Sequence, residues 1–179
     1  MESREFKPFG SVSALTLGGG GIGNVWGETS KDESIASVHL ALESGIDHLD
    51  VAPMYGKGEA ERVVGEAIKE RSRDSFRLTT KCALGSMPDE EVYDRFNTSL
   101  IRSLDTMGTD YVDLFLLHSQ LVENDHESQK PDSSFVATGN LTTLKSFYDA
   151  VVPAMETLKK EGKILNLSLI HISEPTRPP

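Results

Sequence analysis

The sequence predicts an α/β fold built around a parallel sheet, and two observations support this. Short apolar runs of strand length alternate with segments whose apolar residues recur every three or four positions, as in βαβ units. Glycines follow several of the helical segments, where a left-handed residue commonly ends a helix. With 179 residues, 37% of them hydrophobic, the chain has enough apolar material for one sizeable core.

The first two units are expected between residues 13 and 68. A strand over residues 13–17 precedes a glycine-rich loop. Ser30 and Glu33 have the spacing of a capping box, so we expect a helix to begin after Ser30 and to end at Gly45. A second strand covers residues 46–51. The next helix is predicted from apolar residues at helical spacing: Ala60, Val63, Val64, Ala67 and Ile68.

The third and fourth units follow the same pattern. Residues 76–81 are expected to form a strand, and Pro88 opens a long helix that Gly108 closes. The apolar residues of this helix recur at nearly regular steps: Val92, Phe96, Leu100, Leu104 and Met107. Residues 111–118 are the most apolar segment of the chain, as expected of a strand that is buried on both faces.

The segments after this strand are less regular. Residues 120–139 are polar and without periodicity, which indicates an exposed loop. Residues 141–161 regain helical spacing, with Pro153 at the position where this helix is expected to kink. Residues 163–167 begin a fifth strand, and no sixth element follows.

Charge and cysteine content narrow the class of partner. The formal net charge of -10 argues against binding to nucleic acid or to an anionic membrane surface, so a small-molecule partner is expected. Cys82 is the single cysteine, so no intrachain disulfide can form. No apolar run reaches the roughly 18 residues of a membrane span. We therefore expect a soluble cytoplasmic protein, and the oligomeric state is not indicated.

Four residues form a chemically coherent set. Asp50, Lys81 and His118 each stand at or just after the end of a predicted strand, and Tyr55 lies in the loop after Asp50. In a parallel β/α barrel the active site is assembled at this rim. A lysine ammonium beside a tyrosine lowers the pKa of the phenol, and an aspartate can hold that lysine. Taken singly, each residue also has an ordinary structural explanation. Tyr55 could be a turn residue and Lys81 a solvated strand end. Asp50 could be a helix N-cap and His118 a hydrogen-bonded core residue.

The segments around these residues resemble the aldo-keto reductase family. Residues 45–59, GIDHLDVAPMYGKGE, resemble the family signature around its aspartate and tyrosine. Thr80 and Lys81 match the position of its lysine, and residues 103–118 resemble the segment that ends at its histidine. The resemblance runs from about residue 15 to residue 166.

This resemblance implies a (β/α)8 barrel of which only the first four to five β/α units are present. It implies reversible reduction of a small carbonyl substrate (an aldehyde, ketone or sugar), with NADPH as the usual hydride donor and NADH as the alternative. Tyr55 would be the general acid, Lys81 the group that lowers its pKa, and Asp50 the partner of the lysine and a candidate cofactor ligand. His118 would orient the substrate.

The glycine-rich segment offers a competing interpretation, because residues 18–23 fit the GxGxxG fingerprint of a Rossmann dinucleotide site. That site needs a helix that opens within the glycines, whereas the helix signal here comes seven residues after Gly23. The pattern therefore favours a loop at the barrel mouth. Gly23 is then a candidate cofactor contact, and Trp26 a candidate wall of the substrate pocket. His39, His48, His126 and His171 lack metal-ligand spacing, so no metal is expected.

We expect residues 1–166 to form a partial aldo-keto reductase domain and residues 167–179 to be a non-native tail. The tail, LSLIHISEPTRPP, resembles no part of the family and looks like a translated sequencing adapter. A barrel of this kind typically needs about 250 residues. The chain by itself is therefore expected to expose strand edges, to be poorly stable and to be inactive. A cofactor-binding regulatory subunit and an inactive fragment remain alternatives to a reductase.

Overall fold

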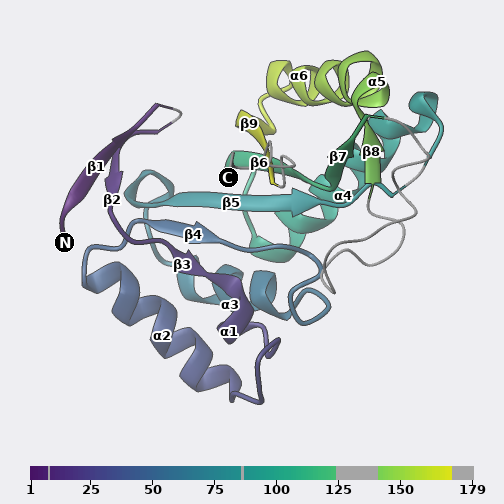
Figure 1. Ribbon diagram of the computed structural model, residues 1–179. Coiled ribbons are helices and arrows are strands. Elements are labelled where there is room, and N and C mark those ends of the chain that lie inside the picture. The colour runs from purple at the N-terminus through teal and green to yellow at the C-terminus, as the bar shows by residue number, and fades with distance from the viewer. Residues whose placement is uncertain (8, 86, 124–140, 171–179) are drawn as a thin grey trace, which may run out of the picture.

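The computed structural model describes residues 1–7, 9–85, 87–123 and 141–170, and a parallel sheet lies at its centre (Figure 1). Within these ranges the sheet has five strands, and each is hydrogen-bonded to the next one along the chain. They are β3 (Leu17–Gly18), β4 (His48–Asp50), β5 (Arg77–Cys82), β6 (Val112–His118) and β9 (Ile164–Ile170). A Rossmann sheet would instead reverse its strand order. The sequential order confirms the parallel α/β prediction and matches the first five strands of a barrel.

Helices between the strands pack against one another in chain order, as the outer ring of a barrel does (Figure 1). They are α2 (Lys31–Glu43), α3 (Glu59–Ile68), α4 (Val92–Met107) and α6 (Val152–Lys160). All five apolar positions predicted for α4 are buried. Phe96 of α4 meets Phe115 of β6 edge to face, with ring centroids 5.5 Å apart. The main core therefore lies between the helices and the sheet.

Hydrogen bonds and backbone angles confirm two of the predicted helix ends. The backbone nitrogen of Glu33 donates to Ser30 Oγ over 3.2 Å, and the backbone nitrogen of Ser30 donates to Glu33 Oε2 over 3.1 Å. This is the expected capping box at the start of α2. Gly108 ends α4 in the left-handed conformation, with φ of 66°.

The strand expected over residues 13–17 is divided in the structure. β1 (Ser3–Phe6) and β2 (Gly10–Ser13) form an antiparallel hairpin, and only Leu17 of the expected strand lies in β3. Two hydrogen bonds fasten the hairpin beside β4: Ser13 N donates to Asp47 Oδ1 over 2.8 Å, and Asp47 N donates to Ser13 Oγ over 3.0 Å. These bonds hold the end of the hairpin next to the residue that precedes β4, and residues 14–16 belong to no strand, so the predicted strand is interrupted.

The expected helix over residues 141–161 is also divided. Its first residues form β8 (Leu141–Thr143), which pairs with β7 (Gln120–Val122). The helical part runs through α5 (Leu144–Ser146), a π-helical turn (Phe147–Val151) and α6. The wide π turn lies just before Pro153, which has no N–H to donate, and so it takes the place of the expected kink. Residues 120–122 are therefore not loop, and residues 124–139 lie outside the described ranges.

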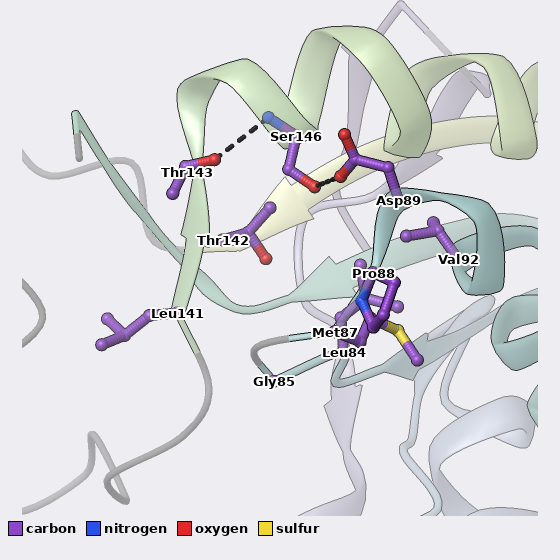
Figure 2. A pocket seen from close by; sticks show the side chains of 10 residues that line it. All are labelled: Leu84, Gly85, Met87, Pro88, Asp89, Val92, Leu141, Thr142, Thr143 and Ser146. Atoms are coloured by element: carbon purple, nitrogen blue, oxygen red, sulfur yellow. Dashed lines mark hydrogen bonds between the residues drawn. The ribbon is translucent and has the colours of Figure 1, made fainter. Parts of the chain in front are cut away.

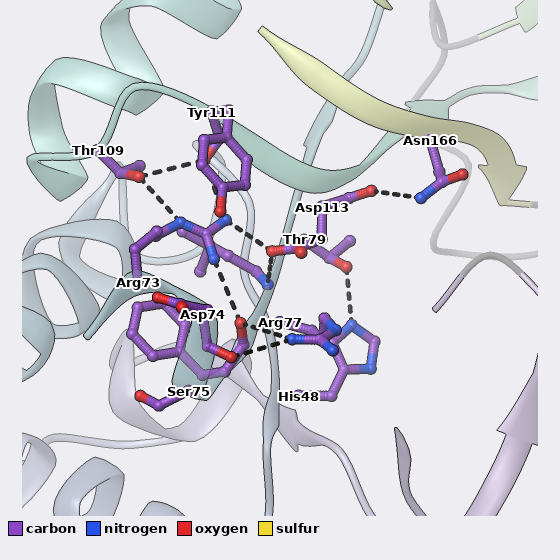
Figure 3. A network of polar contacts seen from close by, with 12 residues as sticks. His48, Arg73, Asp74, Ser75, Arg77, Thr79, Thr109, Tyr111, Asp113 and Asn166 are labelled. Carbon is purple, nitrogen blue, oxygen red and sulfur yellow. Dashed lines mark hydrogen bonds and ion pairs between the residues drawn. The ribbon is translucent and has the colours of Figure 1, made fainter. Parts of the chain in front are cut away.

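A polar network joins the amino-terminal ends of β4, β5 and β6 (Figure 3). Asp113 Oδ2 accepts hydrogen bonds from Arg73 Nη2 at 2.6 Å and from Leu78 N at 2.8 Å. Arg73 lies in the short 3₁₀ helix η1 (Arg73–Ser75). His48 Nε2 lies 2.8 Å from Thr79 Oγ1, and burial lowers the pKa of His48. The network stabilises the end of the sheet opposite to the strand ends that carry the candidate catalytic residues.

Candidate active site

The structure brings the four predicted catalytic residues together at the carboxyl ends of neighbouring strands. Asp50 ends β4, Lys81 lies near the end of β5, His118 ends β6, and Tyr55 lies in the turn after β4. The Lys81 side chain is 1% exposed, and its ammonium donates hydrogen bonds to Asp50 Oδ1 and, over 2.9 Å, to the carbonyl oxygen of Val51. A buried ammonium needs such partners, because burial removes its hydration.

Tyr55 lies between the lysine and the histidine. Lys81 Nζ is 4.7 Å from the centroid of the Tyr55 ring, which is the geometry of a cation–π contact. The Tyr55 and His118 rings meet edge to face, with centroids 6.3 Å apart and an angle of 86° between their planes. The His118 side chain is buried, whereas that of Tyr55 is partly exposed. A phenol, an ammonium and an imidazole therefore share one small region at the rim.

The backbone around Tyr55 explains why this turn contains two glycines. Gly56, Lys57 and Gly58 all have positive φ values, of 62°, 55° and 88°. Glycine adopts this left-handed conformation without the steric cost of a Cβ atom. Ala60 N then donates to the Tyr55 carbonyl oxygen over 3.3 Å, so the turn leads directly into α3. Tyr55 is thus held in place by a turn whose three consecutive positive φ angles few other sequences can adopt.

The glycine-rich segment forms a one-turn helix, α1 (Gly19–Ile22), where the sequence predicted a loop. Close packing explains the difference. A Cβ on Gly19 would lie 3.1 Å from Tyr55 Cδ2, and a Cβ on Gly23 would lie 3.1 Å from the Tyr55 carbonyl carbon. Gly23, a candidate cofactor contact, is buried against this turn, so packing alone accounts for the glycine. The segment supports the turn that carries Tyr55.

Trp26, the candidate wall of a substrate pocket, lies after α1 and is 82% exposed. A Cβ on Gly20 would lie 2.8 Å from the Trp26 indole, so the ring rests against the backbone of the glycine-rich segment. A small cavity of about 120 Å³ opens beside two of the catalytic candidates. Its lining residues are Pro53, Met54, Lys81, Cys82, Ala83, Arg95, Ser99 and His118. Trp26 does not line this cavity.

The sequence analysis missed Glu61, a buried acid on α3. Its side chain is covered, with 2% of the residue exposed, and Oε1 accepts a hydrogen bond from Thr80 Oγ1 over 2.7 Å. Thr80 precedes Lys81, so this bond ties the helix that follows Tyr55 to the strand that carries the lysine. Burial raises the pKa of Glu61. No sequence signal marks this residue, because a glutamate in a helix is ordinarily solvated.

Replacing Glu61 with glutamine is expected to change how stability depends on pH. Because the pKa of Glu61 is raised above its ordinary value of 4.5, the stabilisation from the protonated acid is present below pH 4.5. This stabilisation is lost as the pH rises through the raised pKa, because the same carboxyl group ionises at a lower pH in the unfolded chain. Glutamine keeps an oxygen that can accept from Thr80 and does not titrate. In chemical denaturation, the free energy of unfolding of Glu61→Gln should therefore rise relative to that of the wild type as the pH increases.

The matched control for this prediction is Glu70→Gln, at an exposed glutamate just after α3. Its side chain is exposed, so the difference in unfolding free energy between Glu70→Gln and the wild type should depend much less on pH. An equally weak pH dependence for Glu61→Gln would contradict the expected result.

The strand order and the rim cluster define a protein of the (β/α)8-barrel class. Residues 14–173 match the sequence model of the Aldo/keto reductase family, and the chain belongs to this family. Aldo-keto reductase YhdN of Bacillus subtilis is 39% identical over 114 residues, which are 60% of this chain and 34% of that protein. L-galactose dehydrogenase of Arabidopsis thaliana is 28% identical over 154 residues, 85% of this chain and 42% of that protein.

A solved structure shares the fold over almost the whole chain. An aldo/keto reductase from Klebsiella pneumoniae, crystallised with NADP and acetate, superposes with a TM-score of 0.69 at 26% identity. The match covers 96% of this chain and 50% of that protein. The chain thus spans between about a third and a half of the length of these three relatives.

Two further facts bear on the kind of site. Among the described residues, no group of three or more His, Cys, Asp or Glu side chains is placed to hold a metal ion. None of the helices in the described ranges has the length and apolar content that a bilayer crossing requires.

Proposed function

We propose that this chain supplies the catalytic residues of an NADP(H)-dependent reductase, which converts the carbonyl group of an aldehyde, ketone or sugar into an alcohol. The observation that carries the proposal is the rim cluster, in which Lys81 contacts Asp50 and the Tyr55 ring while His118 packs against the same ring. Family membership and the NADP-bound relative support it.

Each residue of the cluster is proposed to have a separate role in carbonyl reduction. Reduction adds a hydride to the carbonyl carbon and a proton to the carbonyl oxygen. Tyr55 is proposed to donate that proton from its hydroxyl. The Lys81 ammonium, held by the carboxylate of Asp50 and the carbonyl oxygen of Val51, favours the negative charge that the phenol oxygen then acquires. His118 is proposed to orient the carbonyl oxygen by a hydrogen bond, so that the proton and the carbonyl oxygen are aligned.

The residues at the rim fit a nicotinamide cofactor. When bound, the reduced nicotinamide supplies the hydride, from NADPH by the family resemblance or from NADH as the alternative. The Asp50 side chain keeps 33% of its surface exposed although Lys81 binds one of its oxygens. Asp50 therefore has acceptor capacity left for a cofactor amide. Trp26, exposed on the segment that supports Tyr55, is proposed to border the substrate.

Replacing Tyr55 with phenylalanine is expected to lower turnover by about 100-fold or more, because it removes the proton donor and keeps the ring. The assay follows NADPH oxidation with a panel of aldehydes, using the natural gene product that contains this chain. NADPH binding, measured by fluorescence, should stay close to that of the wild type. Tyr93→Phe is the matched control, because Tyr93 lies on α4 and its hydroxyl donates to Glu161, at the end of α6, over 2.7 Å.

The outcomes separate the candidate functions. Loss of turnover in Tyr55→Phe alone supports the reductase. Turnover that survives in Tyr55→Phe would overturn the proposed role of the tyrosine. NADPH binding without turnover in any form of the protein would favour a cofactor-binding subunit instead.

A further inference from the structure

A second hollow lies beside the catalytic cluster, with a cavity volume of about 270 Å³ (Figure 2). It is bounded by the connection from β5 to α4 and by the segment β8–α5. Leu84, on its wall, is three positions after Lys81, and its backbone nitrogen donates to Ser119 Oγ over 3.3 Å. Ser119 directly follows His118. The hollow is therefore next to the rim cluster but contains none of the four catalytic candidates.

The two walls of this hollow differ in chemistry (Figure 2). One wall is apolar and is built from the connection after β5 and the start of α4: Leu84, Met87, Pro88 and Val92. The other carries hydroxyl groups and a carboxylate, from Thr142, Thr143, Ser146 and Asp89. A molecule that fits this hollow needs one face of C–H groups and one face of hydrogen-bonding groups.

Hydrogen bonds fix most of the polar wall. Ser146 Oγ donates to Asp89 Oδ1, and Ser146 N donates to Thr143 Oγ1 over 3.1 Å. These bonds join β8–α5 to the short 3₁₀ helix η2 (Asp89–Glu91) that precedes α4. The wall is thus held in place before any ligand binds, which reduces the entropy that binding would cost.

Thr142 is the exception on this wall. The residue is 4% exposed, and within the described residues its Oγ1 has no hydrogen-bond partner. Figure 2 shows this hydroxyl pointing into the hollow. A buried hydroxyl without a partner is unfavourable, because it has lost its bonds to water and gained none. The position of Thr142 therefore points to a bound group that can donate to or accept from a hydroxyl.

We propose that the hollow is an accessory binding site for a small neutral polyol, whose hydroxyls meet Thr142 and the Asp89 carboxylate while its C–H edge lies on Met87 and Pro88. A hydroxyl group both donates and accepts, so one chemical group satisfies both polar partners. The carboxylate disfavours an anion, and Lys145 already lies 3.9 Å from Asp89, which reduces the attraction for a cation. A volume of about 270 Å³ lies just below the range for drug-sized ligands and suits a small molecule.

The test uses the natural gene product that contains this chain, as in the reductase assay, and xylitol, a polyol that has no carbonyl group and cannot be reduced. Spectra of methyl-labelled protein should show saturable shifts of the Thr142 and Met87 methyl groups as xylitol is added. Thr142→Val keeps the shape of the side chain and removes its hydroxyl, and it should weaken xylitol binding about tenfold. Thr157→Val is the control, because Thr157 is exposed on α6 and its hydroxyl donates to the Pro153 carbonyl oxygen of the same helix.

Three results would overturn the proposal. The first is no saturable shift with xylitol in the wild-type chain, which would leave water as the partner of Thr142. The second is equal binding by wild type and Thr142→Val. The third is a stronger response to sodium phosphate or to an alkylammonium ion than to xylitol. The site does not involve Tyr55 or hydride transfer, so its failure would leave the proposed reductase function untouched.

Discussion

Gly56→Ala is expected to lower the free energy of unfolding by about 3 to 5 kcal/mol, because two costs add at this residue. Gly56 has φ of 62°, where an L-residue is strained. A Cβ there would also lie 1.8 Å from the carbonyl oxygen of Gly23, far inside any possible contact distance. Because the obstacle is backbone, one of the two segments must move. Chemical denaturation of the variant and the wild type measures the loss.

A matched control separates these two costs. Gly108 has a nearly equal φ of 66°, and a Cβ there would meet nothing within 4 Å. Gly108→Ala therefore carries only the conformational cost, which is about 1 to 2 kcal/mol. If Gly56→Ala were no worse than Gly108→Ala, the close approach of the Tyr55 turn to the glycine-rich segment would not exist in solution.

Asp113→Ala is expected to destabilise the protein by about 3 kcal/mol. The carboxylate is buried, with 8% of its side chain exposed, and its loss removes the partner of Arg73 and the acceptor of Leu78 N together. A charge left without its buried partner costs several kcal/mol, and the 21% exposure of the Arg73 side chain moderates this value. Thermal or urea unfolding measures the effect, which should appear without any change at the rim cluster.

The control for Asp113 is the ion pair between Lys69 and Glu66, which joins side chains that are 63% and 42% exposed. Exposed pairs contribute little, because water screens the charges and the side chains lose freedom when they pair. Glu66→Ala should therefore leave stability almost unchanged. A comparable loss in both variants would mean that the network of Figure 3 is not specific to the buried carboxylate.

Periodicity predicted the strands β4, β5 and β6 and the helices α2, α3 and α4, and the strand ends predicted that Asp50, Lys81 and His118 lie at one rim of the sheet. The α4 prediction succeeded because a helix buried on one face imposes a local repeat, seen here from Val92 to Met107. The candidate catalytic cluster followed because the carboxyl ends of parallel strands converge. Asp50, Lys81 and His118 therefore meet although they are far apart in sequence.

The features that were missed depend on contacts between distant segments. Glycine disfavours helix, yet α1 forms because Gly19 packs closely on Val51 and Tyr55. Glu61 is buried because Thr80, on another element, offers it a hydrogen bond. The hairpin of β1 and β2 is largely exposed and has no repeat that distinguishes it from loop. No local pattern encodes such pairings, so propensity alone could not identify them.

The pairing of each strand with its successor has a consequence for synthesis on the ribosome. Asp50 and Lys81 are 31 residues apart, and every residue of the rim cluster is present in the nascent chain once His118 has been added. Chains grow far more slowly than neighbouring strands can pair, so the early units can fold while later ones are still being translated. The ion pair between Lys81 and Asp50 can therefore form before β9 leaves the ribosome.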